Sequence, residues 1–282
     1  MTGQGSLAVV GTPIGNLADL SPRAADALRD ADLVACEDTR RTAVLLRHAG
    51  SDAPMLALHQ HNEAGRAADL VARMRDGARV ALVSDAGMPL VSDPGARLVR
   101  AALDAGLPVS VVPGPSAVTA ALAASGLAGE GGFVFLGFAP RRPAERRRLA
   151  ERLAGLDVPA VGFESPRRLP ALLAELAAAL PDRQVAVCRE LTKVHEEVVR
   201  GTAAELAARY ADAPPRGEVA VVVGGAPAGA APDDARLDEV LALLRDAGLG
   251  SGRAADVAAA LGVASRNAAY RRALGGGAGA PH

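Results

Sequence analysis

The sequence predicts an α/β protein with two α/β domains, followed by a small C-terminal helical extension. Short apolar runs alternate with segments in which apolar residues recur at helical spacing, a pattern typical of a mostly parallel sheet with helices between its strands. The chain has 282 residues, half of them hydrophobic. It is therefore long enough for two domains, each with its own core.

In the first half, five apolar runs are expected to form strands, with a helical pattern after each of the first four. Ser21 is a good N-cap and Pro22 suits the first helical turn, where its missing N–H costs nothing. Gly77 is expected just beyond the end of a helix. Asp93 is expected to cap a later helix that starts at Pro94. The expected strands are residues 6–11, 32–37, 55–59, 79–85 and 108–114.

The second half begins with a helical pattern and continues with five further strand patterns. Residues 196–201 alternate polar and apolar positions and follow directly on the preceding strand, so an antiparallel pairing is expected there. Three short helical patterns end the chain. The expected strands are residues 133–138, 158–165, 183–191, 196–201 and 217–225. The expected organisation is a first domain over 1–116, a second over 117–226, a Gly/Ala/Pro linker over 227–234, helices over 235–275 and a disordered tail over 276–282.

Composition excludes several classes of protein. A formal charge of −1 gives no global attraction to nucleic acid or membrane, so any such binding must rest on local patches. Cys36 and Cys188 lie in apolar runs, which favours a reduced setting over a disulfide scaffold. No apolar run approaches the length of a membrane span. We therefore expect a soluble, cytoplasmic protein that contacts no membrane.

Five polar, Gly/Pro-rich loops follow successive strands of the first half. They cover residues 11–16, 36–40, 59–63, 84–95 and 113–117. In the first loop, two glycines and a proline would let the backbone approach a ligand closely. Each loop has an ordinary explanation by itself: a turn, a strand exit, or acids at a helix N-terminus. The histidines of the third loop lack zinc spacing, and no metal is expected. In α/β sheets, ligands bind beyond the carboxyl ends of the strands. The recurrence of such loops at those ends therefore predicts one ligand-binding cleft.

The motifs in these loops resemble a known family. The segments "TPIGNL", "EDTR", "HNE", "SDAGMPLVSDPG", "PGPSA", "ESPRRL" and "RELTK" occur in this order. Together they resemble the ribosomal RNA methyltransferase branch of the tetrapyrrole methylase family, from residue 7 to residue 225 and more loosely through the C-terminal helices. "EDTR" paired with "SDAGMPLVSDPG" is specific for that branch, whereas "TPIGN" and "PGPSA" indicate only the wider family.

The resemblance implies a fold of two α/β domains of the tetrapyrrole-methylase type (a class III methyltransferase), with S-adenosylmethionine held between them. It further implies methyl transfer to the 2′-hydroxyl of a cytidine in the 16S RNA of the small ribosomal subunit. It also implies a homodimer. Gly87 would let the main chain approach the cofactor, and Asp85 would accept hydrogen bonds or face the sulfonium charge. The implied cofactor-binding residues are Pro13, Ile14, Gly15, Ser84, Asp85, Ala86, Gly87, Met88, Ser116, Ala117, Phe163, Leu191 and Ala220.

A ribose hydroxyl is a poor nucleophile, so the reaction needs a general base or a cation that stabilises the developing alkoxide. The candidates are Glu37, Asp38, Arg40, His61, Glu63 and Lys193. Lys193 is the sole lysine beside 30 arginines, and a buried lysine can lose its proton. An ordinary surface lysine is an equally good interpretation. The sequence leaves the choice of base open.

Arginines supply the expected RNA contacts. Clusters lie in residues 139–153 and near the C-terminus, where they fit phosphate binding but equally fit a solvated helix face. Only 2% of residues are aromatic, so base stacking across an open sheet is not expected. No DNA binding is expected. The candidate RNA-binding residues are Arg141, Arg142, Arg146, Arg147, Arg148, Arg266, Arg271 and Arg272.

Two alternatives stay open. A methyltransferase acting on a tetrapyrrole precursor would use the same cofactor fold, but the "EDTR" loop and the arginine clusters speak against it. A non-enzymatic, ligand-sensing nucleic-acid-binding regulator would place its function in the C-terminal helices. The concentration of polar loops in the first half speaks against that reading.

Overall fold

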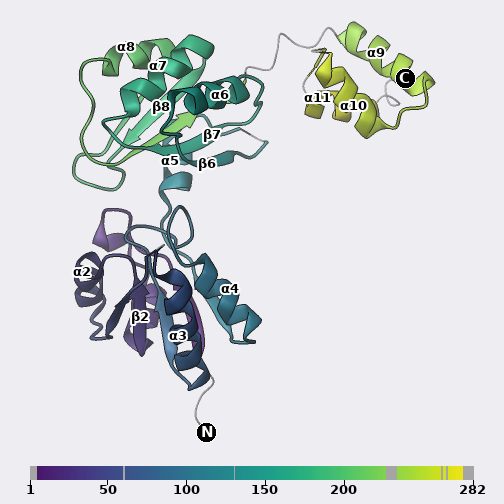
Figure 1. Ribbon diagram of the computed structural model, residues 1–282. Helices are drawn as coiled ribbons and strands as arrows, with labels where there is room; N and C mark the ends of the chain where they lie inside the picture. The colour runs from purple at the N-terminus through teal and green to yellow at the C-terminus, as the bar shows by residue number, and fades with distance from the viewer. Residues whose placement is uncertain are drawn as a thin grey trace, which may run out of the picture.

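The structure is a computed structural model that describes residues 5–59, 61–129, 131–226, 234–261, 263–264 and 266–275. Two five-stranded sheets each carry helices on both faces, and a separate unit of three helices follows (Figure 1). The α/β class with a C-terminal helical extension is thereby confirmed. Among the described residues, no helix is both long and apolar enough to cross a membrane.

The first sheet is parallel throughout, with the strand order β3-β2-β4-β1-β5. Helices α1 and α2 pack on one face, and α3 and α4 pack on the other. Burial on both faces explains why its central strands are almost purely apolar. The strands are β1 (Ser6–Val10), β2 (Leu33–Cys36), β3 (Met55–Ala57), β4 (Arg79–Leu82) and β5 (Val109–Val112). The helices are α1 (Pro22–Asp30), α2 (Thr39–Ala49), α3 (Glu63–Arg75) and α4 (Ala96–Asp104), and a short 3-10 helix covers Leu17–Asp19.

Two of the expected helix signals are confirmed. The side chain of Ser21 accepts a hydrogen bond from the backbone N–H of Ala24 at 3.1 Å, and Pro22 opens α1. Gly77 follows α3 with a φ of 101°, a left-handed conformation that glycine adopts without strain.

The expected cap of α4 is wrong. The helix begins at Ala96, its N-cap is Gly95, and no side chain of the cap residue bonds to the helix. Instead Oε1 of the buried Glu63 accepts hydrogen bonds from the backbone N–H of Gly95 at 3.0 Å and of Arg97 at 2.7 Å. A carboxylate from α3 thus satisfies the donors that the sequence assigned to Asp93.

The second sheet is mixed, with the strand order β6-β7-β10-β8-β9. Only β6 and β7 pair in parallel; the other three pairings are antiparallel. The expectation of a mostly parallel sheet is therefore wrong here, whereas the antiparallel pairing of residues 196–201 with the preceding strand is confirmed. The strands are β6 (Val134–Phe138), β7 (Ala160–Glu164), β8 (Gln184–Arg189), β9 (Glu197–Thr202) and β10 (Val219–Val223).

Helix α5 (Ala117–Ser125) covers one face of the second sheet, and α6 (Pro143–Ala154), α7 (Leu169–Ala179) and α8 (Ala203–Tyr210) cover the other. Ile14, from the first loop of the chain, packs in the same apolar cluster as α5. This contact joins the two sheets at the point where the α5 segment connects them (Figure 1). The domain boundary after residue 116 stays a prediction.

The C-terminal unit contains α9 (Asp234–Asp246), α10 (Ser251–Ala260) and α11 (Arg266–Gly275). It has a core of its own, built around Leu237, Leu241 and small alanines. The predicted linker lies outside the described residues except for its last residue, and the predicted tail lies wholly outside them.

Candidate active site

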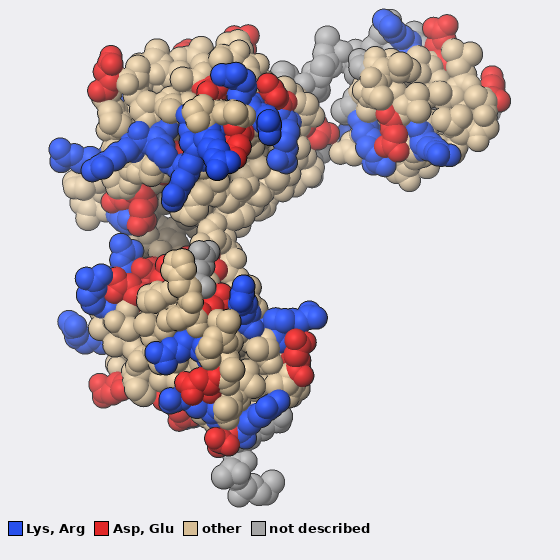
Figure 2. Space-filling model, viewed as in Figure 1, with Lys and Arg blue, Asp and Glu red and all other residues tan. Residues whose placement is uncertain are grey.

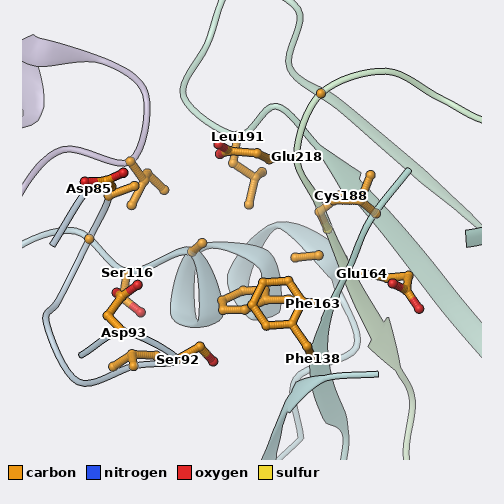
Figure 3. Close-up of a pocket in the computed structure, with 18 of the residues that line it drawn as sticks. Asp85, Ser92, Asp93, Ser116, Phe138, Phe163, Glu164, Cys188, Leu191 and Glu218 are labelled. Atoms are coloured by element: carbon orange, nitrogen blue, oxygen red, sulfur yellow. The ribbon is translucent and has the colours of Figure 1, made fainter. Parts of the chain in front are cut away.

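A cavity of about 450 Å³ lies between the two sheets, within the range of small-molecule sites. Figure 3 shows carboxylates of the first unit on one side, and aromatic and aliphatic side chains of the second unit across from them. The lining residues are Ile14, Glu37, Arg41, Asp85, Ala86, Gly87, Met88, Val91, Ser92, Asp93, Ser116, Ala117, Phe138, Phe163, Glu164, Ser165, Pro166, Cys188, Leu191, Gly217, Glu218, Val219 and Ala220.

Ten of the thirteen predicted cofactor-binding residues line this cavity. Pro13, Gly15 and Ser84 do not. The first, second, fourth and fifth polar loops converge on it, but the third does not. His61, in that third loop, is exposed and lies outside the lining.

The first-unit wall is built by two loops that hold each other. The backbone N–H of Thr12 donates to the carbonyl of Gly87 at 2.9 Å, and Gly87 N–H donates to the carbonyl of Thr12 at 3.2 Å. The hydroxyls of Thr12 and Ser84 donate to the same Gly87 carbonyl, at 3.2 and 3.1 Å. Gly87 has a φ of 86°, and a Cβ there would lie 3.2 Å from Cγ2 of Ile14. Ser84 does not line the cavity, but its hydroxyl holds the backbone of the lining residue Gly87 in place.

The glycines of the first loop serve a different purpose from the expected one. A Cβ on Gly11 would lie 2.6 Å from the backbone nitrogen of Gly114, and a Cβ on Gly15 would lie 2.4 Å from Cγ of Lys193. Both distances are shorter than any normal contact. These glycines let neighbouring loops pack against one another, whereas the sequence suggested close approach to a ligand.

The second-unit wall combines apolar side chains with the carboxylates of Glu164 and Glu218. The ring of Phe163 packs edge-on against Phe135 and Phe138, with centroids 5.2 and 5.5 Å apart. Cys188 and Leu191 continue this wall. Burial raises the pKa of the Cys188 thiol to about 11, so the thiol stays protonated at neutral pH.

The loops beside the cavity carry backbone strain. The non-glycine residues with positive φ, within the part of the chain that the structure describes, are Leu90, Ser92, Glu190 and Thr192. Ser92 lines the cavity, and Glu190 and Thr192 flank the lining residue Leu191. Such conformations cost energy and persist only where the surroundings enforce them, as at ligand sites.

Three carboxylates of the first unit meet in the cavity. Asp85 Oδ1 accepts a hydrogen bond from Asp38 N–H at 3.0 Å, and its Oδ2 lies 3.7 Å from Nε of Arg41. Burial, together with the charges of Glu37 and Asp85, raises the pKa of Asp93 to about 6. Burial, followed by the charge of Asp85, also raises the pKa of Glu37. Asp93 thus changes charge close to neutral pH.

The other predicted acid–base candidates lie outside the cavity. Asp38 caps α2 and pairs with Arg40 at 2.8 Å, and the hydrogen bonds from Arg40 lower its pKa. The Arg40 side chain is 89% exposed. Glu63 does not line the cavity, because its carboxylate accepts hydrogen bonds from the backbone N–H groups at the start of α4.

Lys193 lies behind the rim of the cavity. Its Nζ donates to Glu190 Oε1 at 2.9 Å and to the lining residue Glu218 at 3.0 Å. Partial burial lowers the pKa of Lys193, but the hydrogen bonds and charges of the two glutamates outweigh it, so the net pKa is raised. The expectation that this lysine could lose its proton is wrong.

The predicted arginine cluster is only partly available to a ligand. Arg146 is 9% exposed and donates to the carbonyl of Arg141 at 2.7 Å, so it does not face solvent. The other four candidate arginines of this segment, Arg141, Arg142, Arg147 and Arg148, are exposed. Basic side chains gather on the face of the second unit that carries α6 (Figures 1 and 2). In the C-terminal unit, Arg266 pairs with Asp256, Arg272 pairs with Asp238, and Arg271 is exposed.

Several lining residues were not predicted from the sequence. Asp93 was assigned to a helix cap, and no role was given to Arg41, Val91, Ser92 or Phe138. Three of them, Val91, Ser92 and Asp93, lie in the "VSDPG" segment, which continues the loop that already supplied Asp85. Phe138 is at the end of β6, and the neighbouring strand β7 contains Phe163. The position of Phe138 beside the cavity depends on the register between these two strands, which the sequence does not give.

A small-molecule cavity between a parallel and a mixed α/β unit, lined by carboxylates from both, is typical of an α/β enzyme. The chain belongs to the tetrapyrrole (corrin/porphyrin) methylases, whose family model matches residues 6–207.

Curated relatives are similar over most of the chain. It is 45% identical to ribosomal RNA small subunit methyltransferase I of Mesorhizobium japonicum over 271 residues, which cover 95% of this chain and 91% of that one. It is 44% identical to the protein of the same name from Thermotoga maritima, over 78% of this chain and 99% of the relative. About a fifth of this chain therefore has no counterpart in the second relative.

Solved structures share the fold. The methyltransferase CobJ matches with a TM-score of 0.61 and 23% identity, over 79% of this chain and 95% of that one. The uroporphyrin-III C-methyltransferase of Thermus thermophilus, complexed with S-adenyl homocysteine, matches with a TM-score of 0.57 and 21% identity, over 78% of this chain and 97% of that one.

Proposed function

We propose that this chain uses S-adenosylmethionine to methylate the 2′-hydroxyl of a cytidine in the 16S RNA of the small ribosomal subunit. One observation carries the proposal: the cavity with its unpaired carboxylates lies in a chain that is 45% identical, over nearly its whole length, to a small-subunit RNA methyltransferase. A cytoplasmic location follows from a ribosomal substrate.

The cavity fits this cofactor. Its charged lining residues are five acids and one arginine, Arg41. Three of the acids are paired with basic side chains, but Glu37 and Asp93 form no ion pair with a described residue. An apolar cavity with uncompensated negative charge favours a ligand that is apolar and cationic. S-Adenosylmethionine, when bound, supplies a methyl group from a positively charged sulfonium.

We assign proton removal to Asp93. A carboxylate whose pKa lies near 6 is mostly ionised at neutral pH and still basic enough to accept a proton as the nucleophile attacks. The 2′-hydroxyl proton would pass to Asp93 as the hydroxyl oxygen bonds to the methyl carbon that S-adenosylmethionine supplies, and the electron pair of the broken carbon–sulfur bond would stay on sulfur. Glu37 beside it keeps the pKa of Asp93 high.

The remaining predicted residues have supporting roles in this proposal. Asp38 donates its backbone N–H to Asp85 and so orients that carboxylate. Lys193, held between two glutamates, fixes the loop that carries Leu191. The exposed arginines of the α6 region, Arg141, Arg142, Arg147 and Arg148, are proposed to hold RNA phosphates. Arg271 and its neighbours in α11 are proposed as a second, accessory RNA contact.

The decisive experiment is transfer of a labelled methyl group from S-adenosylmethionine. Small subunits that lack this modification, free 16S RNA and a porphyrinogen are offered in parallel. The expected product, after digestion to nucleosides, is 2′-O-methylcytidine. Label in the porphyrinogen alone would overturn the RNA assignment in favour of a tetrapyrrole substrate. Label in neither, with the cofactor bound, would reject both.

The homodimer belongs to the same proposal and rests on the family resemblance. Light scattering at micromolar concentration is expected to give twice the 28.4 kDa mass of one chain. A mass equal to one chain would contradict it.

A further inference from the structure

Phe138 is the most exposed phenylalanine of the described chain, although it lines the cavity. Its exposed fraction is 60%, compared with 39% for Phe133, and Phe135 and Phe163 are partly buried. The edge-on contact with Phe163 holds the ring, with an interplanar angle of 61°. An aromatic ring that is fixed on one side and open on the other is a surface to which another ring can stack.

A β-bulge turns Phe138 toward the cavity. In the pairing of β6 with β7, Phe135 lies opposite Val161 and Phe138 lies opposite Phe163, so three steps on β6 match two on β7. The extra residue falls at or beside Gly137, whose φ is 67°. Bulges of this kind occur next to active sites, where they redirect a side chain.

The bulge decides which face of the sheet receives the ring. Side chains alternate along a strand, so an unbroken β6 would place Phe138 on the same face as Leu136. Leu136 packs against the cluster beneath α6, α7 and α8. With the bulge, Phe138 shares the face of Phe135 and Phe163, which is the face that borders the cavity. The chain thus departs from regular strand geometry and leaves a large apolar ring in solvent.

We propose that Phe138 is the platform on which the base of the target nucleotide stacks while its ribose enters the cavity. The inference rests on the proposed function, because it requires an RNA substrate. Single-stranded RNA is commonly held by bases splayed onto aromatic side chains, and a pyrimidine ring offers an uncharged face for this contact. Carboxylates of the first unit lie across the cavity from this wall, so a base stacked here leaves its ribose facing them (Figure 3).

The platform also explains how a chain with so few aromatic residues can select an unstacked nucleotide. The arginines of the α6 region would hold phosphates without regard to sequence. A ring at the cavity mouth adds a contact that only a base rotated out of its stack can make. Phe138 is therefore assigned to positioning of the substrate, and the chemistry stays with the carboxylates.

The test compares Phe138→Ala, Phe138→Tyr and the matched control Phe133→Ala. Phe133 precedes the same strand, is also exposed, and lies outside the cavity lining. For each variant, cofactor affinity is measured by calorimetry, RNA affinity by filter binding, and kcat and KM by methyl transfer. Phe138→Ala is expected to raise the KM for RNA by about 5- to 100-fold, the usual scale for losing one base–aromatic stack. Cofactor affinity is expected to stay within about twofold, and Phe138→Tyr and Phe133→Ala to resemble the unaltered chain.

Two outcomes overturn the platform. Phe138→Ala with unaltered RNA affinity and KM would show that the ring makes no contact with RNA. Loss of cofactor affinity in Phe138→Ala, with KM for RNA unaltered, would assign the ring to the adenine of the cofactor. If the unaltered chain binds RNA but transfers no methyl group to it, the proposed function fails. The effect of Phe138→Ala on RNA binding then still decides the platform.

Discussion

Asp93→Asn is expected to remove most methyl transfer while leaving the cavity intact. The substitution replaces one carboxylate oxygen by an amide nitrogen of similar size, so the lining changes little in volume. It removes the group that accepts the 2′-hydroxyl proton in the proposed reaction. The single-turnover rate at saturating RNA and cofactor is therefore expected to fall by about 10²-fold or more, the common scale for a general base.

The pH dependence gives a second measure. With a pKa of about 6, Asp93 is ionised in about one tenth of the molecules at pH 5 and about nine tenths at pH 7. The value of kcat/KM for the cofactor, which reports on the free enzyme, is expected to fall about tenfold between pH 7 and pH 5. Glu37 and Asp85 are the charged groups that act on Asp93 in the cavity, and Arg41 pairs with Asp85. A bound sulfonium would favour the ionised form, so kcat should turn down at a lower pH than kcat/KM.

The contribution of Asp93 to the free energy of unfolding should fall as the pH rises, whereas its contribution to the rate should increase. The pKa of Asp93 is about 6 in the folded chain, above its ordinary value of 3.8, so the folded state holds this proton more tightly than the unfolded state. The resulting stabilisation is present at low pH and is lost as the pH rises from about 4 to about 6. Asp93→Asn should therefore raise the melting temperature at pH 7, and this gain should shrink as the pH approaches 4.

Two further variants identify the base. Asp104→Asn removes an exposed acid of α4 far from the lining and controls for the change in net charge. Glu37→Gln should retain most of the rate and move the kcat/KM inflection to lower pH, because the charge of Glu37 raises the pKa of Asp93. The assignment is refuted if Asp93→Asn keeps its rate within about threefold and Glu37→Gln loses about 10²-fold, since the base would then be Glu37.

The positions of most lining residues follow from the sequence because the carboxyl ends of parallel strands meet at one edge of a sheet. Ile14 and Asp85 were placed on this basis and by family motif, and both line the cavity. The loop that contains His61 does not reach it. Strand β3 is at one edge of the sheet, with β2 and β4 between it and β1, whereas the other edge strand, β5, pairs directly with β1 and leads into α5. Strand order, which a single sequence does not reveal, made this difference.

The direction of strands in the second sheet could not be predicted from their composition. Residues of β10 are buried throughout, as are those of β2. Yet β10 runs antiparallel to both neighbours and β2 runs parallel to both of its own. A strand buried on both faces is a continuous apolar run in either direction. The bulge in β6 could not be predicted from the sequence either, because a bulge is defined by the register with the partner strand β7.

Arg146 is different, because its burial was predictable. Leu149, Ala150 and Leu153 occupy the buried side of α6, and Arg146 stands three, four and seven residues before them. That spacing places it on the core face of the helix. The sequence prediction grouped all the arginines of this segment together and did not take their helical spacing into account. Helical periodicity therefore separates the arginines that can contact RNA from the one that cannot.

Three further outcomes are expected. Glu63→Ala should cost about 1–3 kcal/mol of unfolding free energy, because two backbone N–H groups of α4 lose their acceptor, while the rate per folded molecule should change little; an unaltered melting temperature with a lost rate would contradict this. The double variant Arg147→Ala and Arg148→Ala should weaken RNA binding and make its salt dependence shallower, with cofactor affinity unaltered, and an unaltered salt slope would show that these arginines do not contact phosphate. The last prediction concerns Lys193, whose ammonium group lies between Glu190, on the loop that carries Leu191, and Glu218, which precedes β10. Lys193→Met leaves these carboxylates without a cation, and their repulsion should loosen a loop whose backbone is already strained. Cofactor affinity, measured by calorimetry, should therefore fall by about tenfold, the scale of one lost charge-assisted hydrogen bond, while the rate at saturating cofactor stays within a few fold. Lys193→Arg keeps the charge and should recover part of the affinity. If Lys193→Met instead binds the cofactor normally but reacts about 10²-fold more slowly, the ammonium group acts on the transferring atoms and the loop is held by other contacts.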